Sequence, residues 1–70
     1  MPYVNVRITN DGATPEQKAE IIRLITQALM DVLGKRPEHT HVVIDEVAHE
    51  NWGFAGVPTT EFKRRATEGA

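Results

Sequence analysis

The first segment of the chain alternates apolar and polar side chains, whereas the next segment repeats apolar side chains at helical spacing. In residues 2–9, Val4, Val6 and Ile8 alternate with mostly polar neighbours, and this period of two predicts a strand with one apolar face. Residues 15–33 have apolar side chains three and four positions apart, which predicts one long amphipathic helix. These side chains are Ile21, Ile22, Ile25, Ala28, Leu29, Val32 and Leu33, with Leu24 at one edge.

Residues that cap helices mark both ends of this segment. Thr14 and Gln17 have the spacing of a capping box, and Pro15 between them suits the first helical position. Gly34 suits the left-handed conformation that commonly follows a helix, and Pro37 prevents the helix from continuing. The sequence therefore predicts that the helix starts beside Thr14 and stops at Gly34.

A second strand is predicted over residues 41–48, where β-branched side chains are frequent. Val42 and Ile44 fall on one face and Val43 and Val47 on the other, so we expect both faces of this strand to be covered. A strand, a helix and a strand in this order predict a right-handed β-α-β unit with parallel strands, in the α/β class.

The rest of the chain contains turn residues and then charged ones. Residues 51–58, with the sequence NWGFAGVP, predict a glycine-punctuated loop or small hairpin. Residues 59–70 are expected to form a short C-terminal helix or a mobile tail.

The length of the chain predicts one domain, residues 1–70, that needs partners. A 70-residue domain buries about 60% of its unfolded surface and is marginal alone. The sequence has no cysteine, and its three histidines lack a zinc-binding spacing, so we expect neither disulfides nor a metal site. Oligomerisation is the remaining means of stabilisation. Two copies joined edge to edge would form a four-stranded sheet with two helices on one face.

Charge and hydropathy exclude several classes of partner. The net charge is −2, with no basic stripe of the kind that binds nucleic acid. No apolar run is long enough to predict a membrane span or a signal peptide. We therefore expect a soluble, cytoplasmic protein with no nucleic acid or membrane partner.

Several features together resemble the 4-oxalocrotonate tautomerase family. They are Pro2 directly after Met1, the β-α-β order, the helix start PEQKAEIIRLITQAL, the strand VVIDEV and the aromatic turn from Trp52 to Gly56. The resemblance covers residues 2–57. It implies a homohexamer, a trimer of dimers, in which removal of Met1 exposes an N-terminal proline as the catalytic group.

The resemblance gives Pro2 a chemical role. Without Met1, its nitrogen is a secondary amine, and an ordinary α-amino group has a pKa of about 7.7 to 8.0. Burial and nearby cations would lower this pKa toward the range in which a general base works best. The alternative is that Pro2 only marks the start of the strand, where proline is sterically tolerated.

Two arginine positions of the family differ in this chain. Ala13 falls where members that process dicarboxylates have an arginine that binds a carboxylate, and the loop is one residue longer here. His41 falls where a second arginine polarises the carbonyl oxygen of the substrate. Imidazole can donate a hydrogen bond but lacks the guanidinium fork. The alternative for His41 is a surface position at the end of a strand.

Two aromatic residues are candidates for the substrate pocket. Trp52 falls where the family has an aromatic side chain that walls the pocket, although a tryptophan in so small a protein is often part of the core or an interface. Tyr3 follows Pro2 and is a candidate for the same pocket, with a position on the sheet face as the alternative.

These features predict a tautomerase that moves a proton between the enol and keto forms of a small carbonyl compound. Pro2 would be the general base, with His41, Trp52 and Tyr3 as substrate-binding residues and no cofactor. One alternative is a hydratase or dehalogenase of the same superfamily, which needs a carboxylate to activate water. Another is a non-catalytic oligomeric scaffold with a degraded site.

Overall fold

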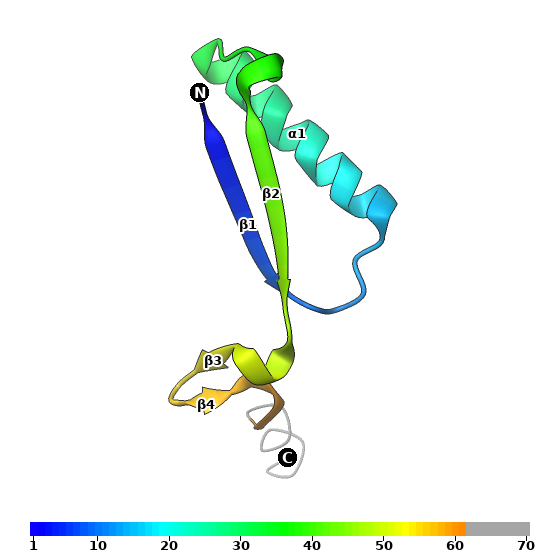
Figure 1. Cartoon of the computed structure of the whole chain (residues 1–70), viewed down its shortest axis with the longest axis vertical. Helices are drawn as coiled ribbons and strands as arrows, with labels where there is room; N and C mark the ends of the chain where they lie inside the picture. The colour runs from blue at the N-terminus through cyan, green and yellow to red at the C-terminus, as the bar shows by residue number, and fades with distance from the viewer. Residues whose placement is uncertain (62–70) are drawn as a thin grey trace.

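The computed structural model describes residues 1–61, which form a β-α-β unit followed by a small hairpin (Figure 1). The elements are β1 (Tyr3–Thr9), α1 (Pro15–Leu33), η1 (Pro37–His39), β2 (His41–Val47), η2 (His49–Asn51), β3 (Gly53–Phe54) and β4 (Val57–Pro58), where η denotes a short 3₁₀ helix. Residues 59–61 are helical, and the rest of the expected C-terminal tail lies outside the described residues. The predicted order of strand, helix, strand and hairpin is confirmed.

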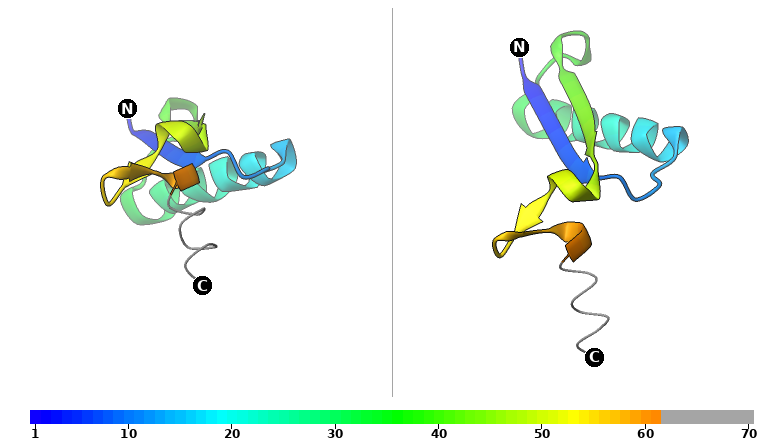
Figure 2. Two further views of the ribbon diagram at one scale, coloured as in Figure 1. Left: turned by 90° about the horizontal axis from the view of Figure 1, so that it is seen from below. Right: turned by 60° about the horizontal axis from the view of Figure 1, so that its bottom comes forward.

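Strands β1 and β2 pair in parallel, with Tyr3 opposite His41 and Thr9 opposite Val47. Because residues alternate along a strand, even-numbered and odd-numbered side chains occupy opposite faces of this sheet. Helix α1 packs against one face (Figure 2), where it contacts the half-buried side chains of Val6, Ile8 and Ile44 around a small cavity. The other face has no covering element within residues 1–61.

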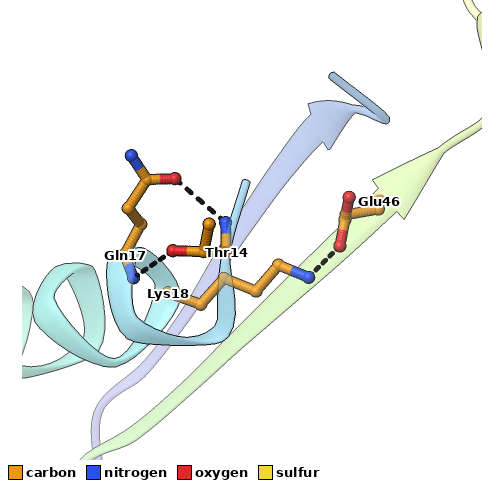
Figure 3. Close-up of polar contacts among 4 residues, drawn as sticks. All are labelled: Thr14, Gln17, Lys18 and Glu46. Carbon is orange, nitrogen blue, oxygen red and sulfur yellow. Dashed lines mark hydrogen bonds and ion pairs between the residues drawn. The ribbon is translucent and has the colours of Figure 1, made fainter. Parts of the chain in front are cut away.

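Both ends of α1 have the predicted caps. The Thr14 hydroxyl accepts a hydrogen bond from the Gln17 backbone N–H at 3.1 Å, and the Gln17 side chain accepts one from the Thr14 N–H at 2.9 Å (Figure 3). At the other end, Gly34 has φ 66° and its N–H donates to the carbonyl of Met30. A positive φ of this kind suits glycine. The helix boundaries are therefore set by local hydrogen bonding.

An ion pair joins the start of α1 to the end of β2. Lys18 lies in the first turns of the helix, and its ammonium group contacts the Glu46 carboxylate on the strand (Figure 3). Both side chains are half-shielded from solvent, at 32% and 25% exposed. This contact places the first turns of α1 against the face of the sheet that carries the even-numbered residues.

The apolar stripe of α1 is wider than the surface that the sheet offers it. Ile25 and Leu29 are half-buried, but Leu24 is 49% and Val32 80% exposed. No apolar residue among 1–61 is fully buried, and Thr59, at 6% exposed, is the sole buried residue of that range. A two-stranded sheet is too narrow to cover the whole stripe, so the single buried face predicted for the helix is only partly realised within one chain.

The β3–β4 hairpin turns through Ala55 and Gly56, which have φ values of 54° and 79°. Two consecutive positive φ values are typical of the tight turns that join antiparallel strands. The hairpin lies beyond the carboxyl ends of β1 and β2 (Figure 1). None of the helices within residues 1–61 is both long and apolar enough to cross a lipid bilayer.

Candidate functional site

Pro2, Tyr3 and His41 lie together at the amino ends of the two parallel strands. The Pro2 carbonyl accepts a hydrogen bond from the His41 backbone N–H at 3.0 Å, and Tyr3 is opposite His41 in the register. Pro2 is half-buried, whereas Tyr3 is 65% exposed and His41 is also exposed. The structure therefore brings three of the four predicted site residues to one end of the sheet.

Trp52, the fourth predicted residue, lies at the opposite end, between η2 and β3. Its backbone carbonyl accepts hydrogen bonds from both the N–H and the hydroxyl of Thr59, at 2.7 and 2.6 Å. These two bonds close the base of the β3–β4 hairpin on Trp52. The tryptophan is therefore held at a defined place beyond the carboxyl ends of the strands.

One chain alone does not bring Pro2 and Trp52 together. Strand β1 has seven residues, and a rise of about 3.3 Å per residue separates its two ends by about 20 Å. A small molecule in contact with Pro2 cannot reach Trp52 of the same chain. A single chain therefore contains two separate half-sites.

The half-site at Trp52 is a hollow of about 440 Å³ on the surface. Its lining residues are Arg7, Ile8, Thr9, Asp11, Ala13 and Trp52. Ala13 occupies the loop position at which the family resemblance expects a carboxylate-binding arginine. Its methyl group lines the hollow together with the indole, which leaves this part of the wall apolar.

Polar contacts fix the loop that borders the hollow. The His49 Nε2 lies 2.8 Å from the Asp11 Oδ1, and the Thr9 hydroxyl donates a hydrogen bond to the other carboxylate oxygen of Asp11. His49 belongs to η2, so these contacts join the loop after β1 to the segment before Trp52. His49 is 22% exposed. The rim of the hollow is thus built from two segments that are far apart in sequence.

A second polar cluster occupies the sheet face that α1 does not cover. The Asn5 side chain donates to the Asp45 Oδ2 at 2.8 Å and to the Val43 carbonyl at 3.2 Å. The Arg7 guanidinium lies 3.6 Å from the same Asp45 oxygen. Arg7 therefore connects this cluster to the hollow, which its side chain also lines.

Two features of the hollow were not predicted as part of the site. Arg7 lies on the same face of β1 as Thr9, near the end of the strand that is nearest Trp52. The alternation of residues along the strand could have indicated this position from the sequence. The contact between Asp11 and His49 had no signal, because it joins residues 38 positions apart and depends on where η2 folds back. Within residues 1–61, no three His, Cys, Asp or Glu side chains are placed to hold a metal ion.

Comparisons with known sequences show which family the chain resembles. The sequence profile of a family described as "Tautomerase enzyme" matches residues 2–61. A protein named a probable tautomerase from Dickeya dadantii is 52% identical over 67 residues, covering 96% of this chain and all of the relative. A 2-hydroxymuconate tautomerase from Pseudomonas putida is 38% identical and covers 91% of this chain and all of the relative.

Solved structures agree with the sequence comparisons. The crystal structure of DmpI from Helicobacter pylori has a TM-score of 0.81 at 31% identity, over 90% of this chain and 97% of that one. A 4-oxalocrotonate tautomerase isozyme from Methylibium petroleiphilum has a TM-score of 0.81 at 27% identity, with 90% and 97% coverage. The chain therefore belongs to the tautomerase family of isomerases and has the β-α-β fold of the 4-oxalocrotonate tautomerases.

Proposed function

We propose that the protein catalyses cofactor-independent enol–keto tautomerisation of a small carbonyl compound, with the Pro2 nitrogen as the general base. The observation that supports this most is that the family match begins at Pro2, and that Pro2 heads a paired strand with its carbonyl held by His41. A ring nitrogen at the start of a rigid strand has a lone pair whose direction is set by the fold.

Removal of Met1 is a requirement of this mechanism. The nitrogen of Pro2 is a non-basic amide while Met1 is attached, and becomes a basic secondary amine after cleavage. Met1 is 87% exposed at the end of β1, so the bond to be cleaved is accessible to an aminopeptidase. The mature amine then takes the proton from the enol hydroxyl and delivers a proton to carbon, while the C=C bond becomes C–C and the C–O bond becomes C=O.

A second copy of the chain supplies the wall of the site. Residues 2 and 10, which flank β1, direct their backbone groups toward β2, as the Pro2–His41 and Val47–Asn10 hydrogen bonds show. Because backbone groups alternate in direction along a strand, those of Tyr3, Asn5, Arg7 and Thr9 face the free edge. Antiparallel pairing of two such edges, with Tyr3 opposite the partner's Thr9, places Pro2 beside the hollow of the partner subunit.

This arrangement accounts for the separation of the two half-sites. The amine of Pro2 would work next to the partner's Trp52, whose ring excludes water and favours the neutral amine. His41, next to Pro2, would donate a hydrogen bond to the oxygen on which charge develops. Tyr3 would line the same end. Further copies covering the bare sheet faces would complete a homohexamer, a trimer of dimers.

Pro2→Ala tests the role of the proline. Alanine also permits Met1 removal, so the variant keeps a terminal amine but loses the ring that sets its pKa and direction. We expect kcat/KM on phenylenolpyruvate, followed by loss of the enol absorbance, to fall by about 10²-fold. Mass spectrometry would establish that Met1 is absent from both proteins.

Pro15→Ala is the matched control, because it removes a proline that begins α1 and is not among the residues that line the hollow. It should leave kcat/KM within about twofold of the parent chain. Equal activity of Pro2→Ala and the parent chain, or full activity of protein that retains Met1, would disprove the N-terminal mechanism.

A further inference from the structure

The hollow at Trp52 combines an apolar wall with one cation. Ile8, Ala13 and Trp52 contribute apolar surface, and Arg7 is the only positively charged residue among those that line it. The Asp11 carboxylate, the negatively charged member of the lining, is already bound to His49 and Thr9. A ligand that fills the hollow therefore meets one apolar surface and one guanidinium group.

The guanidinium of Arg7 is available to a ligand. Within residues 1–61, the polar contact of this side chain is the ion pair with Asp45, at 3.6 Å, which is longer than a hydrogen bond. The Asp45 oxygen involved accepts a shorter bond, 2.8 Å, from Asn5. The Arg7 side chain is 64% exposed. Its ion pair is therefore loose and open to displacement by a carboxylate that binds the guanidinium with two parallel hydrogen bonds.

The proposed dimer brings Arg7 within reach of the reacting amine. When Tyr3 is opposite the partner's Thr9, the partner's Pro2 is beside residue 10 of this chain, three residues from Arg7. Three residues of strand span about 10 Å. The long arginine side chain and a small substrate together can bridge this distance, with the enol at the amine and the acid at the guanidinium.

We propose that Arg7 binds the carboxylate of the substrate, and that the substrate is an enol acid with an apolar body that packs on Trp52. The location of the reacting carbon rests on the proposed function, but the anion-binding role of Arg7 does not. Arg7 would set substrate specificity from the strand face, because the loop beside the hollow, with alanine at position 13, has no positively charged side chain.

Ligand binding tests this role without any turnover. Trp52 is the single tryptophan of the chain, so its fluorescence reports on the hollow directly. The probes are phenylacetate and its neutral isostere phenylacetamide. For the parent chain we expect phenylacetate to bind more tightly. In Arg7→Gln, its Kd should rise by about 10-fold or more, the usual effect of losing hydrogen bonds to a charged group, while the Kd of phenylacetamide should change less than about twofold.

Two further variants separate charge from structure. Arg7→Lys keeps the charge but loses the planar fork, so its Kd for phenylacetate should lie between those of the parent chain and Arg7→Gln. Arg23→Gln makes the same change on the outer face of α1, where Arg23 pairs with Glu20, and should leave both Kd values unaltered. Sedimentation of each variant should match that of the parent chain.

Kinetics then distinguish this inference from the proposed function. On phenylenolpyruvate, Arg7→Gln should raise KM more than it lowers kcat, whereas Pro2→Ala should lower kcat. Unaltered binding of phenylacetate by Arg7→Gln, or an equal loss of phenylacetate and phenylacetamide, would overturn the role of Arg7 even if Pro2 proves essential. The parent chain could also prove inactive on phenylenolpyruvate while Arg7→Gln still loses the preference for phenylacetate over phenylacetamide. That result would support the anion-binding role of Arg7 and reject the proposed reaction.

Discussion

At the scale of single residues, the chemistry depends on which side chains share one end of the sheet. Pro2 and His41 are neighbours through a backbone hydrogen bond of 3.0 Å, so the residue proposed to polarise the substrate lies next to the proposed base. His41 is exposed and free to turn toward a ligand. His39, the other histidine close to it in the sequence, lies in η1 rather than in the strand.

The role of His41 predicts a specific kinetic effect. If His41 contacts the oxygen on which charge develops, His41→Ala should lower kcat more than it raises KM, because the contact strengthens in the transition state. A preorganised donor of this kind contributes about 10²-fold, and an exposed imidazole should contribute less. His41→Arg should keep or raise activity, since it restores a bidentate donor. Steady-state kinetics on phenylenolpyruvate measure both variants.

His39→Ala is the control for the two His41 variants, because it removes an imidazole two positions earlier without changing the end of the strand. It should leave kcat and KM unaffected. If His41→Ala also leaves them unaffected while the assembly stays intact, His41 is a surface residue and the donor must be sought elsewhere.

At the scale of elements, local hydrogen bonds set where α1 begins and ends, and one ion pair ties it to β2. On its exposed side, Arg23 donates hydrogen bonds to Glu20 and lowers the pKa of that carboxyl below its usual value. Both side chains are exposed, at 60% and 54%, so this pair affects the local charge more than the fold. The capping box at Thr14 is the stronger determinant of the helix, because it satisfies N–H groups that no helical carbonyl can reach.

The capping box gives a prediction about stability. Thr14→Ala removes the hydroxyl that accepts from the Gln17 N–H and should lower the free energy of unfolding by about 1 kcal/mol. Thr14→Asp keeps an acceptor at the same place and should stay close to the parent chain. Urea denaturation followed by far-ultraviolet circular dichroism measures both. An unchanged midpoint for Thr14→Ala at equal protein concentration would show that the cap makes no net contribution.

At the scale of the whole molecule, the single chain leaves many of its large apolar side chains partly in contact with water. No apolar side chain within residues 1–61 is fully buried, and large ones such as Leu33 and Val43 are 60% and 40% exposed. A chain of this size cannot offset its conformational entropy with so little burial. We therefore expect other copies of the chain to cover the bare sheet face, the free β1 edge and the outer stripe of α1.

The assembly is tested by sedimentation velocity at micromolar concentration. The parent chain should sediment as an oligomer, with a hexamer as the expected species, and little folded monomer. Asn5→Pro removes an N–H at the free edge of β1 and should shift the protein toward smaller species and lower activity. Asn5→Ala, which loses the same side chain but keeps the N–H, should remain assembled. A compact monomer of the parent chain would contradict the dimer and the two-chain site together.

The sequence alone determined the elements, because each depends on neighbouring residues. Alternation in residues 2–9, the Thr14–Gln17 box and Gly34 predicted β1 and both ends of α1, and the structure confirms them. The position of Pro2 at the head of a strand was predictable for the same reason. The glycines around residue 55 indicated a turn, and the structure has a tight hairpin there.

Only the tertiary structure decided how the candidate site is divided. The parallel register puts Pro2 and His41 at one end of the sheet and Trp52 at the other, whereas the sequence suggested one common pocket. It also joins Asp11 to His49 and brings Arg7 into the hollow beside Trp52. Such contacts link residues some 40 positions apart. They depend on strand pairing and on the path of the loops after each strand, which the periodicity of a local segment does not encode.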